Sequence, residues 1–433
     1  MDEDFSVGPI DEGIVRADDI TRRWLLGGAG AAGLAAMAAA CTGTADTTAQ
    51  PTTMVPGTLD LPAGESALGA GSFSLFSQDD LNFQALLALG GANLNAAVGE
   101  VITVVDQANA ATGGAGYQSL YDAMVAMGNQ LEEQATDAAN KGHRVTAGAR
   151  FMRAAQYYNQ ALYWVLGTST PGAEAEVYRT MDDTFTQAAE RMDLPGEKIS
   201  IPYESTSMPA WFFRPTDADA RRPTLILNNG SDGQLVDMIA QGGRQALDRG
   251  YNLLIFEGPG QGSLLFEQNI VFRSDWEAVI APIIDELEKR DDVDPSKIVL
   301  RGISFGGLLS PRAAAFEKRV AAVVADPGDV DAFASYPQSL QDVAGDGDQA
   351  NVNKVWTEVI IPGTTAEQTF ALKKRLEIYT QEAHTEAVAG QVPTDWYTIS
   401  RTIETFDISD VAAQISCPTF VAQYQGDDLF WDN

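Results

Sequence analysis

The stretch Lys297–Pro311 (KIVLRGISFGGLLSP) constrains the fold more than any other part of the chain. An apolar run, Ile298–Leu300, is short enough for a buried strand. Gly302–Gly306 follows as G-x-S-x-G, and a helix-compatible run comes next. In this strand–turn–helix context the motif indicates a nucleophile elbow, in which a strained turn presents a Ser hydroxyl at a helix N-terminus. We therefore predict Ser304 as a nucleophile; the alternative is an ordinary turn with a capping Ser.

The length and the net charge of the chain limit the functions that it can have. At 433 residues the chain can form two domains and a large core. A net charge of −32 argues against nucleic acid and anionic membrane surfaces as partners, because both would be repelled. We expect a small-molecule substrate, and the sequence leaves the oligomeric state open. The two Cys and two His residues lack the spacing of a disulfide scaffold or a metal site, so we predict no metal centre.

Residues 1–41 are predicted to be a twin-arginine export segment. Arg22 and Arg23 precede Trp24–Ala40, which is rich in Ala and Gly and shorter than the ~20 apolar residues of a membrane span. Small residues before Cys41 resemble a lipoprotein processing site, with ordinary cleavage or an uncleaved anchor as alternatives. The prediction is an exported protein, either a cell-surface lipoprotein or secreted, which meets a membrane only through this N-terminal anchor.

The predicted export segment also contains a glycine motif that resembles a dinucleotide-binding fingerprint. Gly28–Gly33 fits G-x-G-x-x-G, but no strand precedes it, so the dinucleotide interpretation fails and no cofactor is predicted.

Residues 42–77 and 78–193 differ sharply in composition. The former are rich in Thr, Ala, Gly and Pro and predict a flexible linker. The latter predict a helical cap domain, with helices at Tyr117–Asn140, Val145–Leu166 and Thr170–Arg191. For the aromatic residues of the second helix we favour core packing, with a place in a substrate pocket as the alternative: Tyr157, Tyr158, Tyr163 and Trp164.

Residues 194–433 predict an α/β core. Short apolar runs that alternate with helical segments indicate a doubly wound, mostly parallel sheet. Residues 328–406 interrupt this alternation with polar, helical sequence, and we expect a lid over the carboxyl ends of the strands. The predicted strands besides Ile298–Leu300 are Lys198–Tyr203, Ala210–Arg214, Pro223–Asn229, Tyr251–Glu257, Val320–Ala325 and Pro418–Tyr424.

A Ser nucleophile needs a base, and the base needs an orienting carboxylate. Asp428, at the end of the last predicted strand, suits the carboxylate role, with Asp427 as the alternative; both could instead be solvated turn residues. Neither His143 nor His384 has the expected place after the carboxylate. We therefore expect the base beyond Asn433, in a chain whose C-terminus is truncated here; a complete but inactive chain is the competing interpretation.

Oxyanion stabilisation requires backbone N–H groups beside the nucleophile. Phe305 is predicted to supply one, and Gly230 or Ser231, after the strand PTLILNN, the other. Asp232 in the same loop is a candidate auxiliary acid or base, or alternatively the N-cap of the next helix.

Taken in order, the motifs PYE…PAWFFRP, LNNGSDG, FEGPGQG, GISFGG and QGDD follow a helical front end that contains Gly142–Ala161. This combination resembles the α/β hydrolase branch of 2,6-dihydroxypseudooxynicotine hydrolase and the fermentation–respiration-switch-like esterases. The resemblance implies cleavage of an ester, or of a carbon–carbon bond next to a ketone, by Ser, Asp and His with an extra carboxylate that Asp232 matches. The chain departs from the branch at Ser263, where an acid is common, and in lacking the His.

The leading hypothesis is an exported serine hydrolase with a helical cap, acting on a small ester or ketone. The alternative is a surface-tethered binding protein on a degenerate hydrolase scaffold that lacks the catalytic His.

Overall fold

The computed structural model describes residues 75–91, 94–192, 196–215, 220–345 and 347–424. The predicted export segment with Cys41, most of the linker, and Asp427 and Asp428 lie outside these residues, so those assignments stay predictions. No helix within the described ranges combines the length and the apolar composition that crossing a bilayer requires.

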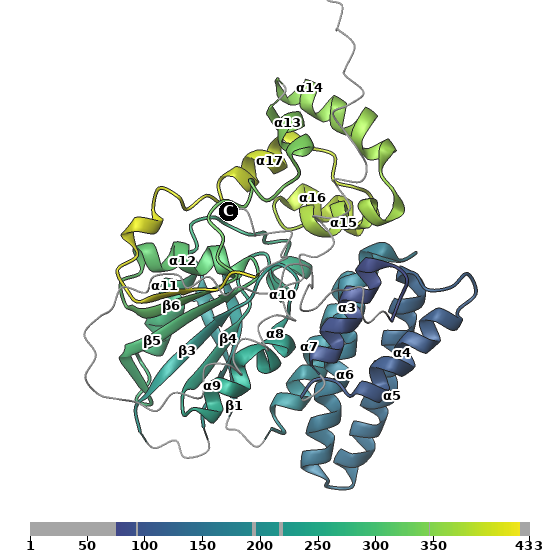
Figure 1. Ribbon diagram of the computed structural model, residues 1–433. Coiled ribbons are helices and arrows are strands. Elements are labelled where there is room, and N and C mark those ends of the chain that lie inside the picture. Colours follow the sequence, from purple (N-terminus) through teal and green to yellow (C-terminus); the bar gives the residue numbers. More distant parts are fainter. Residues whose placement is uncertain (1–74, 92–93, 193–195, 216–219, 346, 425–433) are drawn as a thin grey trace, which may run out of the picture.

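A seven-stranded sheet with the order β1-β2-β4-β3-β5-β6-β7 forms the centre of the described chain (Figure 1). The first two strands form an antiparallel hairpin, β2 pairs antiparallel with β4, and all other pairs are parallel. This confirms the predicted α/β class with a mostly parallel, doubly wound sheet. The strands are β1 (Gly196–Tyr203), β2 (Thr206–Phe213), β3 (Arg222–Asn228), β4 (Asn252–Phe256), β5 (Val293–Ile303), β6 (Val320–Asp326) and β7 (Thr419–Val421).

The central strands are buried on both faces, which explains why they are continuous apolar runs. Every residue of β4 (NLLIF) is buried, whereas β1, at the edge, is largely exposed. Helices α11 (Glu277–Leu287) and α12 (Gly306–Phe316) lie on one face of the sheet, and the segment between β3 and β4 lies on the other (Figure 1).

The alternation of apolar runs and helical segments in the sequence predicts one helix between β3 and β4, ending at Arg249. In the structure this segment is broken into α8 (Leu235–Met238), a π-helical turn η3 (Ile239–Gly243) and α9 (Arg244–Asp248). The break has a tertiary cause. Gly242 has φ +122°, and a Cβ built on it would lie 2.2 Å from Nη1 of Arg301. The same Nη1 donates to the carbonyl of Gln241 at 2.9 Å, so a β5 side chain requires the irregular turn.

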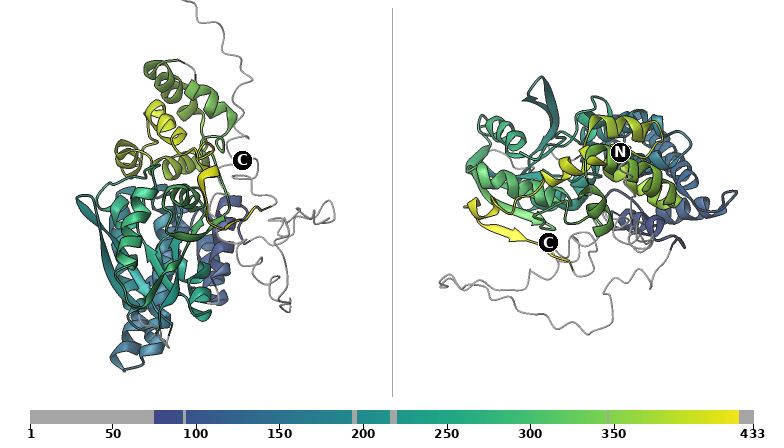
Figure 2. Two further views of the ribbon diagram at one scale, coloured as in Figure 1. Left: turned by 90° about the vertical axis from the view of Figure 1, so that its left-hand side faces the viewer. Right: turned by 90° about the horizontal axis from the view of Figure 1, so that it is seen from above.

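Within the described residues, helices α3 to α7 form the cap, which lies beside the sheet (Figures 1 and 2). The long pair α5 and α6 packs closely because Gly128 lies against the ring of Tyr158, where a Cβ would meet ring carbon Cε1 at 2.6 Å. Tyr157, Tyr158 and Trp164 are buried, as the core interpretation predicts. The cap helices are α3 (Asp79–Gly90), α4 (Val98–Ala110), α5 (Tyr117–Asn140), α6 (Arg144–Trp164) and α7 (Glu174–Ala189), with short 3₁₀ turns η1 (Val165–Gly167) and η2 (Pro171–Ala173) before α7.

The predicted lid is present as a group of helices beyond one end of the strands (Figure 1, and Figure 2, left). Its own core contains Trp356 and Trp396, whose rings stack with centroids 4.8 Å apart. The lid consists of α13 (Gln338–Gly345), α14 (Gln349–Val355), η4 (Trp356–Ile360), η5 (Ile361–Gly363), α15 (Ala366–Leu376), α16 (Gln381–Val388) and α17 (Trp396–Glu404).

An aromatic cluster fastens the lid to the cap. Phe370 of α15 is buried, and its ring centroid lies 4.6 Å from that of Tyr117 and 5.2 Å from that of Trp164. The two cap rings also stack on each other at 5.3 Å. Offset aromatic pairs at such separations add to the free energy of burial, so this cluster holds the lid in place.

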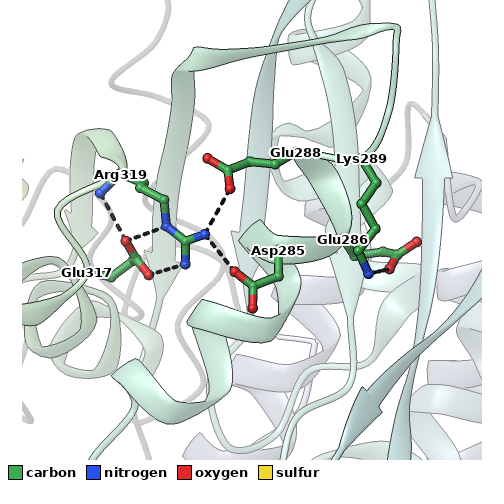
Figure 3. A network of polar contacts seen from close by, with 6 residues as sticks. All are labelled: Asp285, Glu286, Glu288, Lys289, Glu317 and Arg319. Atoms are coloured by element: carbon green, nitrogen blue, oxygen red, sulfur yellow. Dashed lines mark hydrogen bonds and ion pairs between the residues drawn. The ribbon is translucent and has the colours of Figure 1, made fainter.

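The acidic surface is partly neutralised by shared arginines. Arg319 contacts Glu317, Asp285 and Glu288 at 2.6, 2.6 and 3.0 Å, so one guanidinium serves three carboxylates (Figure 3). The same face holds the pair Lys289–Glu286 at 2.8 Å. Such exposed pairs contribute little to the free energy of folding individually, but they limit repulsion in a chain of this charge.

The Phe370→Ala substitution tests the docking of the lid. Removing a buried Phe leaves a cavity between lid and cap, and we expect a loss of about 3–5 kcal/mol in the free energy of unfolding. Urea denaturation measures this loss. Phe316→Ala is the matched control because Phe316 is 40% exposed. Equal losses in the two variants would contradict the role of the cluster.

Candidate active site

Ser304 lies in the tight turn between β5 and α12 that the elbow motif predicts. Its φ is +57°, a left-handed conformation that costs energy for a residue with a side chain. The Ser304 N–H donates to the carbonyl of Asp326 at 2.9 Å, and its own carbonyl accepts from the Gly307 N–H at 2.7 Å. The motif glycines are required by contact: a Cβ on Gly302 would lie 1.7 Å from the carbonyl oxygen of Gly306.

The loop after β3 lies directly against this turn. A Cβ built on Gly230 would be 2.6 Å from Cβ of Ser304 and 2.9 Å from the amide nitrogen of Phe305. The N–H of Gly230 already donates to Oδ1 of Asn229 at 2.8 Å. Among the described residues, the N–H groups of Ser231 and Phe305 have no acceptor. Of the two predicted alternatives, the geometry thus favours Ser231 over Gly230 as the second oxyanion donor beside Phe305.

Side chains from the neighbouring loop hold this backbone in place. Nε2 of Gln261 donates to the carbonyls of both Asn229 and Gly230, at 2.8 and 2.9 Å. Oε1 of Gln261 accepts from the Gly258 N–H at 2.9 Å. Because the two carbonyls are fixed, the peptide that carries the Ser231 N–H is fixed as well.

The ring of Phe305 is enclosed by the lid and the core. Its centroid lies 5.1 Å from that of Phe406, 5.3 Å from that of Phe272 and 6.3 Å from that of Tyr379. Tyr379 and Phe406 follow lid helices, so the lid covers the elbow as predicted, and it immobilises the residue whose N–H lies next to the nucleophile.

A pocket opens at Ser304 between the cap and the core. Gln84 and Ala88 of α3, and Asn159 and Tyr163 of α6, form its cap side, while Asp232 contributes from the core. Ser304 itself lines the pocket. Of the aromatic residues in α6, Tyr163 is therefore the one that fits the pocket alternative.

Asp232 does not cap the next helix, whose N-cap is Gln234. Its Oδ2 instead accepts from Nη1 of Arg375 at 2.5 Å, and both side chains are nearly buried. Arg375 could not be identified from the sequence, because a partner 143 positions away in a polar lid helix leaves no local signal. The pair links lid and core beside the pocket.

Neither described histidine is placed to serve Ser304. His143 is exposed at the start of α6. His384 is buried in α16, where Nε2 lies 3.0 Å from Oε2 of Glu174 and Nδ1 lies 3.1 Å from Oδ1 of Asn269. The predicted carboxylates Asp427 and Asp428 follow β7, which runs parallel to β6, so that strand leads toward the sheet edge at which β5 ends.

One group of side chains could hold a cation. Glu174, Glu377 and His384 are all buried and offer ligand atoms within 4.8 Å of one another. Sequence spacing could not show this cluster, because it joins cap and lid. The ammonium of Lys374, 2.6 Å from Oε1 of Glu377, competes with a metal for the same carboxylate. Burial, followed by the charge of Glu174, raises the pKa of Glu377 well above its ordinary value.

A second buried carboxylate anchors the loop after β4. Glu257 accepts from the hydroxyl of Tyr178 at 2.9 Å, and from the hydroxyl and the N–H of Ser263 at 2.9 and 3.0 Å. Gly262, with φ +49°, is required here, since a Cβ would lie 2.0 Å from the Glu257 carboxyl carbon. Ser263, at which the chain departs from the resembled branch, is thus the hydrogen-bond donor of a buried acid.

Comparison with known proteins agrees with this geometry. The family described as "Esterase FrsA-like" matches residues 116–345, more than half of the chain. The chain belongs to the FrsA-like esterase family. The resemblance inferred from the motifs is thereby confirmed at the level of the α/β hydrolase branch.

Relatives of this FrsA-like protein are named hydrolases. Hydrolase ORFZ of Pyricularia oryzae is 31% identical over 206 residues, covering 45% of this chain and 49% of its own. The 20-hydroxy-prefusarin hydrolase FUS2 of Gibberella moniliformis is 26% identical over 268 residues, covering 60% and 63%. The chain thus spans about half to five-eighths of the length of these relatives.

Solved structures show the same fold. The 2,6-dihydroxy-pseudo-oxynicotine hydrolase aligns with a TM-score of 0.55 at 21% identity, covering 78% of this chain and 80% of its own. Wild-type AbyA5 aligns with a TM-score of 0.51 at 17% identity, covering 79% and 80%.

Glu257 makes the stability of this FrsA-like protein depend on pH. Burial, and then the charge of Asp182, raises its pKa from 4.5 to about 7. A raised carboxyl pKa means that the folded state holds a proton that the unfolded state has lost. The stabilisation is present below pH 4.5 and is lost as pH rises through about 7.

We expect the Glu257→Gln variant to lack this loss. Relative to the variant, the free energy of unfolding of the wild type should fall by about 3 kcal/mol between pH 4.5 and 8. Urea denaturation at several pH values measures the difference. The exposed control Glu133→Gln should follow the wild type, and parallel pH profiles for wild type and Glu257→Gln would contradict the assignment.

Proposed function

We propose that this protein is a serine hydrolase that cleaves a small ester or a carbon–carbon bond next to a ketone. The observation that carries the proposal is the conformation of Ser304 on the pocket, beside two N–H groups without a protein acceptor in the described chain. A strained turn persists only where the surrounding structure requires it, and such turns concentrate at functional sites.

The geometry supports a sequence of steps. Oγ of Ser304 attacks a substrate carbonyl, and its proton passes to a base. The negative charge on the carbonyl oxygen is stabilised by the N–H groups of Phe305 and Ser231. Collapse expels the alcohol of an ester, or the carbanion of a cleaved carbon–carbon bond, which takes up a proton. Water then hydrolyses the acyl-enzyme.

Three parts of the proposal rest on residues outside the described ranges. We assign the orienting acid to Asp428, with Asp427 as the alternative, because both follow β7. The base is proposed to be a His C-terminal to that acid, which is the order of residues in α/β hydrolases. Export through the twin-arginine segment and lipidation of Cys41 remain proposals from the sequence.

Asp232 separates the two reaction types. A carbon leaving group needs a proton donor more than an alkoxide does, and Asp232 is a carboxyl group on the pocket lining that belongs to the oxyanion loop. Its ion pair with Arg375 fixes the direction of its Oδ2. We propose that Asp232 moves a proton in carbon–carbon cleavage and that ester hydrolysis depends on it less.

Ser304→Ala tests the nucleophile. We expect kcat for p-nitrophenyl acetate to fall by at least ~10³-fold, since a missing nucleophile removes covalent catalysis. The matched control is Ser310→Ala, because Ser310 is a fully buried Ser on α12 without a hydrogen-bond partner in the described chain. The protein expressed from its complete reading frame is assayed spectrophotometrically. Unchanged turnover in Ser304→Ala would contradict the proposal that Ser304 is the nucleophile.

A further inference from the structure

The polar groups around the Ser304 pocket are dominated by amides. On the cap side these are Gln84, Asn95, Gln156, Asn159 and Gln160, and Gln241 faces them from the core. Within the described part of the chain, no Lys, Arg or His lines the pocket. Arg375 is not a lining residue, and its Nη1 is engaged by Oδ2 of Asp232 at 2.5 Å.

Asp237 fixes the direction in which several of these amides point. Its carboxylate accepts from Nε2 of Gln156 at 2.8 Å and from Nδ2 of Asn159 at 2.7 Å. The Gln234 N–H donates to the same carboxylate at 2.9 Å. Because a carboxylate only accepts, both amides must direct their NH₂ groups at Asp237.

Asn95 continues this chain of donors. Its Nδ2 donates to the carbonyl of Val236 at 2.7 Å and to Oε1 of Gln156 at 3.2 Å. The assignment is unambiguous, since a backbone carbonyl can only accept. Oδ1 of Asn95 is then left buried, without a hydrogen-bond partner among the described residues.

Three further oxygens of the lining residues share this condition. Oδ1 of Asp232, Oε1 of Gln160 and Oε1 of Gln241 are also buried without a partner in the described chain. The orientations of the Gln160 and Gln241 amides are free to adapt, but the acceptors of Asn95 and Asp232 are fixed by their other contacts. Leaving a buried acceptor without a donor is unfavourable, so each of these atoms favours a ligand that brings a donor.

We propose that the pocket selects substrates that present hydroxyl or amine hydrogens to Asn95 and Asp232, and that it rejects anionic ones. The chemical class is a small, neutral or cationic, hydroxylated or amino-substituted carbonyl compound. This inference rests on the proposed function only in placing the reacting carbonyl at Ser304. The carboxylates Asp232 and Asp237, with no cation on the lining, account for the rejection of anions.

Three methyl esters of similar size test the proposal: methyl 2,3-dihydroxypropanoate, methyl 2,3-dimethoxypropanoate and monomethyl succinate. The first offers two donors, the second masks both, and the third is an anion. Hydrolysis by the full chain is followed by titration at constant pH. We expect kcat/KM for the dihydroxy ester to exceed that for the dimethoxy ester by about tenfold or more, because one unmet buried acceptor is worth that factor.

Substitutions of lining amides test which residues cause the preference for the dihydroxy ester. Asn95→Leu and Gln160→Leu should each reduce the dihydroxy-to-dimethoxy ratio toward one. Gln160→Leu breaks no side-chain hydrogen bond within the described residues, so it separates pocket chemistry from folding. Gln245→Leu is the matched control, because Oε1 of Gln245 is also buried and unpartnered in the described chain but Gln245 does not line the pocket. Its ratio should equal that of the wild type.

Calorimetric binding of the same esters to Ser304→Ala separates the two proposals. If wild-type hydrolysis does not depend on Ser304 but binding still follows the donor preference, the proposed function fails and this inference holds. Equal or tighter binding of the dimethoxy ester or of monomethyl succinate would overturn the inference, whatever the rate of hydrolysis. So would a ratio that Asn95→Leu and Gln160→Leu both leave unchanged.

Discussion

The left-handed backbone of Ser304 is the constraint on which the rest of the site depends. An L-residue adopts this conformation only when its surroundings compensate for the strain, and here β6 supplies the compensation through the carbonyl of Asp326. The register of β5 beside β3 and β6 then brings the loop of Gly230 against the turn. Glycines are needed wherever these backbones touch. The packing of these strands therefore positions both the nucleophile and the oxyanion donors.

Cap and lid convert this turn into an enclosed pocket. The cap contributes a wall of amides whose directions are fixed by the buried carboxylate of Asp237. Aromatic rings that follow the lid helices pack around Phe305, and Arg375 of the lid forms an ion pair with Asp232. Lid and cap in turn meet at Phe370 and at the group of Glu174, Glu377 and His384. Access to Ser304 thus depends on contacts between segments that are far apart in sequence.

The sequence predicted what local patterns encode. The elbow, the succession of strands along the chain and the helix over Tyr117–Asn140 follow from glycine spacing and from runs of one periodicity, and the lid follows from the polar, helical sequence that interrupts them. It did not predict features that depend on distant partners. Examples are the broken helix at Gly242, which Arg301 of β5 imposes, the pairing of Asp232 with Arg375 and the raised pKa of Glu257. Gly230 and Ser231 could be separated only by the hydrogen bond from the Gly230 N–H to Asn229.

The most direct measurement of the central claim is covalent labelling with a fluorophosphonate, followed by mass mapping of the peptides. These reagents phosphonylate a Ser that is activated as a nucleophile and lies beside oxyanion donors. Applied to the protein from its complete reading frame, the account predicts one adduct, on the peptide that contains Ser304. An intact Ser304 peptide, with no adduct or with the adduct on another residue, would contradict it.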